Sequence, residues 1–220
     1  MEKITSTGKP FSISKLGNRR GFSLVEMAIV LVIIGVIIGA IVKGQDLIVN
    51  SRAKQVTSAA STWRNLAMAF MDRNGRLPGD GAKTGIIKSF AGYSSPTKEI
   101  MSTMTTAPPQ PVTVGSMSFY VFFGNTTGDT TGRNVIVICK VADCQTAFTA
   151  DEMEIIKAVD TAFDGSADAG IGQFRGATSV TLTNGYVTAV TGLADSSVAG
   201  TSTVWSTSFG AAVWAFDRPF

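Results

Sequence analysis

Residues 19–42 read RRGFSLVEMAIVLVIIGVIIGAIV, and this stretch decides what kind of fold the chain can adopt. After two arginines and a glycine comes an apolar run that begins at Phe22 and ends at Val42. Its 21 residues would extend over about 31 Å as an α-helix, which is close to the thickness of a bilayer core. Residues 22–42 are therefore predicted to form a membrane-spanning helix.

The segment before this run is polar and basic. Residues 1–21 carry five basic residues and one acid, a net charge of +4, whereas the rest of the chain has a net charge of −1. Basic residues beside a membrane segment stay on the cytoplasmic side, so the residues after Val42 are expected to be exported. An ordinary secretory signal would be followed by a small-residue cleavage site, and none follows Val42.

One acid, Glu26, lies within the apolar run, four residues after Phe22. A charged side chain inside a membrane segment is costly unless it is paired, so such a residue is a functional candidate. The alternative interpretation is an interfacial acid near the start of an anchor helix.

Residues 19–26, RRGFSLVE, and the apolar run after them resemble the prepilin N-terminal signature shared by type IV pilins and type II secretion pseudopilins. In that family a membrane-embedded prepilin peptidase cuts after the glycine and methylates the new N-terminal amine. The resemblance implies cleavage between Gly21 and Phe22, which would remove residues 1–21 as a leader, and N-methylation of Phe22. It also implies that Glu26 pairs with the Phe22 amine of a neighbouring subunit.

A second apolar stripe follows the membrane segment. Its members recur at spacings of three and four residues, which is typical of one helix face: Val49, Ala53, Val56, Ala60, Trp63, Ala67 and Phe70. Gly75 is placed to cap the helix, and residues 77–80, LPGD, predict a turn. The resemblance implies one long helix over residues 22–75, with residues 22–42 as the transmembrane segment and filament core. A separate amphipathic helix after a break at Lys43 and Gly44 is the alternative.

The remaining residues, 76–220, predict an exported globular α+β domain. Strands are expected at 116–123, 134–139 and 209–216, with a hairpin of 180–183 and 186–190 around an Asn-Gly turn. Thr149 and Glu152 form a capping-box pattern at the start of a second helix, and residues 81–114 are interpreted as a loop-like connection. The predicted fold class is α+β, with the C-terminal half of a long hydrophobic helix packed on an antiparallel β-sheet, as in type IV pilins.

Cys139 and Cys144 are the only cysteines, too few for a zinc site of four thiolates. In an oxidising compartment they favour a disulfide that closes a tight turn, and free thiols are the alternative.

The chain contains no histidine, and we find no nucleophile elbow, phosphate loop or dinucleotide fingerprint, so neither an enzyme nor a bound cofactor is expected. Asp160, Asp164 and Asp168 are spaced by four residues and leave calcium binding open. Their spacing matches no EF-hand, and solvated acids at a helix end are the alternative. The slightly negative charge after residue 21 does not favour nucleic-acid binding.

The resemblance implies a structural subunit of a type IV pilus, first a single-pass protein of the bacterial inner membrane and then part of an extracellular filament. Its expected partners are other copies of itself, the prepilin peptidase, the assembly machinery and the membrane. Two alternatives stay open: a type II secretion pseudopilin in a periplasmic pseudopilus, and a minor pilin that acts as a binding or adhesion module at a filament tip. The resemblance leaves adhesion, twitching motility, DNA uptake and protein secretion as candidate roles of the filament.

Overall fold

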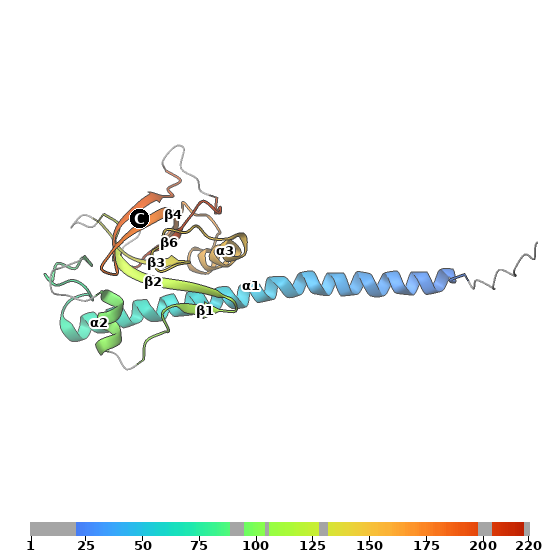
Figure 1. Cartoon of the computed structure of the whole chain (residues 1–220), viewed down its shortest axis with the longest axis horizontal. Coiled ribbons are helices and arrows are strands. Elements are labelled where there is room, and N and C mark those ends of the chain that lie inside the picture. Colours follow the sequence, from blue (N-terminus) through green and yellow to red (C-terminus); the bar gives the residue numbers. More distant parts are fainter. Residues whose placement is uncertain (1–20, 89–94, 104–105, 128–131, 198–203, 218–220) are drawn as a thin grey trace, which may run out of the picture. The chain divides into compact units, whose positions relative to one another are not determined.

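The structure is a computed structural model that describes residues 21–88, 95–103, 106–127, 132–197 and 204–217. The predicted leader lies outside the described residues, apart from Gly21. The chain divides into two units, Met1–Gly44 and Gln45–Phe220, and each is described by itself. Figure 1 shows the helices and strands, with labels where there is room.

Helix α1 comprises Leu24–Asn74, and no break occurs in it at Lys43 and Gly44. In the first unit its large apolar side chains are all exposed, as Leu24 (89 %) and Ile34 (46 %) illustrate. Among the described helices, α1 is long and apolar enough to cross a membrane. Gly75 adopts φ +65° and donates its N–H to the Met71 carbonyl at 2.8 Å, which ends the helix as predicted.

In the second unit, α1 packs on the sheet through the predicted stripe. Six of its seven members are buried: Ala53, Val56, Ala60, Trp63, Ala67 and Phe70. The small alanines let the backbone of α1 approach the strands, while the Trp63 ring meets Phe123 of the sheet edge-on at 6.2 Å. The packed half of α1 is therefore fixed by one continuous apolar face.

Within the described residues, six strands form the sheet, in the order β1-β2-β3-β6-β4-β5. Their bounds are β1 Val112–Val114, β2 Met117–Asn125, β3 Asn134–Cys139, β4 Phe174–Thr183, β5 Tyr186–Leu193 and β6 Ala211–Ala215. The predicted α+β architecture, a long helix on a mostly antiparallel sheet, is confirmed.

One pairing was not expected: β2 and β5 pair in parallel, at Phe123 with Tyr186 and Gly124 with Val187. This pairing joins β2, β3, β6, β4 and β5 into a closed ring. Gly124 permits it, because a Cβ at this position would lie 2.1 Å from the Val187 carbonyl oxygen. The predicted antiparallel sheet thus closes into a small barrel through one parallel pairing.

The ring separates two apolar cores. Alternate residues of β3 belong to different cores: Ile136 and Ile138 pack with α1 and α3, while Val135 and Val137 pack with small residues of β4 and β6. Because both faces of β3 and β6 are covered, every residue of these two strands is buried.

Helix α3, Ala150–Asp164, begins with the predicted capping box: Thr149 Oγ1 accepts from the Glu152 N–H, and the Glu152 carboxylate accepts from the Thr149 N–H. The loop predicted for residues 81–114 is wrong in part, since it contains α2, Pro96–Thr103, and β1. Helix α2 is held by Glu99, which binds Arg76 at 3.0 Å and the Gly79 N–H at 2.7 Å.

Candidate functional site

The start of α1 is organised by Ser23 and Glu26. The Ser23 N–H donates to Glu26 Oε2 at 2.8 Å, and the Glu26 N–H donates to Ser23 Oγ at 3.2 Å. This reciprocal pair is a capping box, which satisfies two N–H groups that a helix start leaves without partners. The negative charge of Glu26 also lies in the first turn, where the helix dipole favours it.

Sequence reasoning identified Glu26 but missed Ser23. The signal was present, because a serine three residues before a glutamate at the start of an apolar run is the capping-box pattern. The structure gives Glu26 a partner within its own chain through Oε2. In the described part of the chain, no hydrogen-bond donor contacts Glu26 Oε1.

Gly21 and Phe22 precede α1 and are not helical. The Phe22 side chain is 78 % exposed, and no atom lies within 4 Å of the position that a Cβ of Gly21 would take. The peptide bond between them is therefore open on the side of Gly21. An enzyme that must bind an extended segment can reach this bond without unwinding a helix.

The exposed apolar side chains of residues 22–42 form a surface that is unsuited to water. Exposed apolar surfaces of this extent occur on proteins that bind a membrane or other protein chains. Length and composition of α1 fit both uses, because a 21-residue apolar segment can span a bilayer and can also pack against other helices.

Cys139 and Cys144 are joined by a disulfide, with 2.00 Å between the sulfur atoms. Both residues are buried in the core that contains Val135 and Val137. The disulfide closes the turn after β3, next to the ion pair between Lys140 and Glu152 at 3.2 Å. Its place in a packed core assigns it a structural role.

Asp160, Asp164 and Asp168 do not converge on a common site. Asp160 Oδ2 accepts from Trp205 Nε1 at 2.7 Å, Asp164 Oδ2 from the Phe174 N–H at 2.7 Å, and Asp168 Oδ1 from the Gly170 N–H at 2.9 Å. Among the described residues, no group of three or more histidines, cysteines or acids is placed to hold a metal ion. The geometry therefore lends no support to calcium binding by this set.

Asp160 is nevertheless unusual, since it is fully buried. Burial is the largest effect on the pKa of Asp160 and raises this pKa from 3.8 to about 7. The hydrogen bond from Trp205 lowers the pKa, but by less than burial raises it. The carboxylates of Asp164 and Asp168 add a smaller upward effect on this pKa.

Residues 16–42 match the prokaryotic N-terminal methylation motif, which covers the capping box, the exposed peptide bond and the apolar surface. No curated protein and no solved structure matches the chain significantly.

Proposed function

Because the prepilin-type methylation motif indicates the type IV pilin and pseudopilin family, we propose that this chain is a structural subunit of a type IV pilus filament. Proteins of this family are structural and not enzymes, and their motif implies processing by a peptidase and assembly into filaments. The observation that carries the proposal is the combination, in one short segment, of an accessible bond, an acid at a helix start and an exposed apolar helix.

Processing comes first in the proposed sequence of events. The peptidase cuts the bond between Gly21 and Phe22 and methylates the new amine of Phe22. The exposed, non-helical position of these two residues supports this step, since the bond is available before α1 begins. Removal of residues 1–21 also removes the net charge of +4 that would hold this end at the cytoplasmic surface.

Assembly then relies on Glu26. In the proposed filament, apolar helices of neighbouring copies surround this carboxylate, and an unpaired charge there is strongly unfavourable. Oε1, which no described donor contacts, is available to the Phe22 amine of the adjacent copy while Oε2 keeps its bond to Ser23. The pair would cancel both charges and fix the axial stagger between helices.

The proposed location follows from the same segment. Before assembly, residues 22–42 anchor the chain in the inner membrane as a single-pass protein, with the second unit exported. After assembly, the same residues form the core of an extracellular filament. The disulfide between Cys139 and Cys144 is consistent with an oxidising compartment.

Electron microscopy of sheared cell-surface material, with intact-mass measurement of its main protein, tests this function. We expect filaments of this chain that lack residues 1–21 and carry one methyl group at Phe22. Filaments that retain the leader would contradict the proposed processing. Normal surface filaments in cells without this chain, together with a defect in protein secretion, would favour the pseudopilin alternative instead.

A further inference from the structure

The segment of α1 from Gln45 to Gln55 leaves large apolar side chains uncovered in the second unit. Leu47 is 71 % exposed and Ile48 is 52 % exposed, although the neighbouring turns of the same helix are packed on the sheet. Hollows lie on both sides of this segment, and residues of α1 and α3 line most of them. We call the two sides the arginine flank and the lysine flank.

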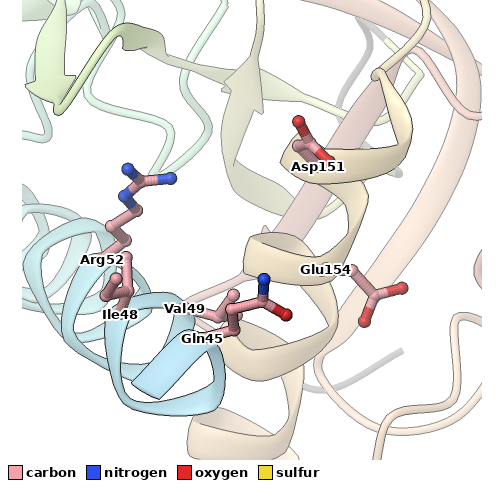
Figure 2. A pocket seen from close by; sticks show the side chains of 6 residues that line it. All are labelled: Gln45, Ile48, Val49, Arg52, Asp151 and Glu154. Atoms are coloured by element: carbon pink, nitrogen blue, oxygen red, sulfur yellow. The ribbon is translucent and has the colours of Figure 1, made fainter. Parts of the chain in front are cut away.

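The arginine flank consists of Ile48, Arg52, Asp151 and Glu154. These residues line a hollow of about 400 Å³, with α1 on one side and the start of α3 on the other, as Figure 2 shows. The guanidinium of Arg52 lies against Gly115, where a Cβ would come within 3.2 Å of Arg52 Nη2. The Arg52 side chain therefore lies beside the turn between β1 and β2.

The lysine flank consists of Asp46, Asn50 and Lys54. These residues line two further hollows, of about 480 and 610 Å³, that α3 borders through Ala158 and Thr161. Successive residues of an α-helix are rotated by about 100°, so Lys54 points about 200° away from Arg52 around α1. The two flanks are opposite sides of one helix segment.

Each flank carries one acid and one base without a partner. Within the described residues, no hydrogen bond or ion pair involves the side chains of Asp46, Arg52, Lys54 or Asp151. Arg52 is half-buried, and a guanidinium at such a position favours a carboxylate partner. The charges of one flank thus complement those of the other.

We propose that the arginine flank of one copy of this chain binds the lysine flank of the next copy, with Arg52 paired to Asp46 and Asp151 paired to Lys54 across the contact. Leu47 and Ile48 would be covered by the same contact. Because the two surfaces differ, the contact is head-to-tail and leaves one flank free at each end, so it extends into an open chain of copies when the rotation between neighbours does not close a ring. This inference rests on the proposed filament function and assigns the second unit an interface of its own.

Charge reversal tests the contact in cells that express the full chain. We expect Arg52→Glu and Asp46→Arg each to reduce the yield of sheared filaments by about tenfold or more, because like charges then meet across the contact. The double variant should return the yield to near the wild-type level. Lys98→Glu is the matched control, since this exposed residue of α2 lies outside both flanks and undergoes the same change in charge as Arg52→Glu.

A wild-type yield from Arg52→Glu, or a double variant no better than its singles, would overturn the contact while the filament function stands. If the wild-type chain formed no filaments at all, both proposals would fall.

Cysteine cross-linking provides a readout that does not depend on filament yield. The double variant Ile48→Cys and Asn50→Cys places one thiol on each flank, and the native cysteines are already joined and buried. Oxidation of this variant should give a ladder of covalent multimers, because each copy is linked to two others. Dimers without higher species, or no cross-linking in filaments, would overturn the head-to-tail arrangement.

Discussion

Glu26 takes part in two interactions whose contributions need to be separated. Its bond with Ser23 caps α1, and its proposed pairing with the Phe22 amine joins neighbouring copies. Capping is worth about 1 kcal/mol, whereas loss of one partner of a buried ion pair costs about 3–5 kcal/mol. The second interaction should therefore dominate assembly.

A pair of variants distinguishes the two contributions. Glu26→Leu removes the carboxylate and leaves the incoming amine without a partner, so we expect mature protein in the membrane and few or no filaments. Ser23→Ala removes only the hydroxyl that accepts the Glu26 N–H, and filament yield should stay near the wild-type level. Quantitative electron microscopy and blotting of sheared fractions measure both effects. Equal losses from the two variants would mean that helix capping, and not the charge pair, limits assembly.

Asp160 connects the protonation of one buried side chain to the stability of the second unit. Its pKa is about 7 in the folded chain, compared with an ordinary value of 3.8. The folded state therefore binds the proton more tightly than the unfolded state. Protonated Asp160 therefore contributes to the free energy of unfolding, and this contribution is fully present below about pH 4 and is lost as pH rises towards about 7.

Urea unfolding of the purified chain at pH 5 and pH 8 measures this dependence. Since one pKa unit corresponds to about 1.4 kcal/mol, we expect the wild-type free energy of unfolding to fall by a few kcal/mol between these values. Asp160→Asn keeps an acceptor for Trp205 and should remove most of this fall. Asp72→Asn, at an exposed position, is the matched control. An unchanged pH dependence in Asp160→Asn would assign the effect to other groups.

At the scale of elements, the parts that sequence predicts are those with a local signal. The hairpin turn at Asn184 and Gly185 adopts φ +54° and +79°, as an Asn-Gly turn requires, and the capping box of α3 is present. Helix α2 and strand β1 were missed because eight and three residues are too short to show a period. The parallel pairing of β2 with β5 leaves no local signal either, because it joins residues about 60 positions apart.

The disulfide is an element-scale feature with a small expected contribution. Cys139 and Cys144 are five positions apart, and a loop of this length gains about 2 kcal/mol from the cross-link in the chain-entropy model. Alkylation of the denatured, unreduced protein should label neither cysteine, and non-reducing peptide mapping should find one linked fragment. The double variant Cys139→Ser and Cys144→Ser should still fold, with a lower melting temperature. Labelling of both cysteines in freshly isolated protein would contradict the disulfide.

For the second unit as a whole, the order of strands makes the fold depend on its last element. Strand β6 lies between β3 and β4, so the sheet has a gap until residues 211–215 are in place. The ring is completed on the other side by β2 and β5, where the Val190 N–H also donates to the Thr126 carbonyl at 3.0 Å. Contacts between such distant segments raise the contact order, so slow folding is expected for the second unit.

Closure of the ring at Gly124 gives the most direct test of this architecture. In Gly124→Ala, the new Cβ would lie 2.1 Å from the Val187 carbonyl oxygen and 2.5 Å from its nitrogen, which are backbone atoms that cannot rotate away. Strands β2 and β5 would have to separate, and overpacking of this kind costs about 1–3 kcal/mol or more.

The same substitution at Gly44 is the control, because nothing lies within 4 Å there and alanine favours a helix. Urea unfolding should therefore show a clear loss for Gly124→Ala and none for Gly44→Ala. If Gly124→Ala were as stable as the wild type, β2 and β5 would not be in contact, and the second unit would hold an open sheet in place of a ring.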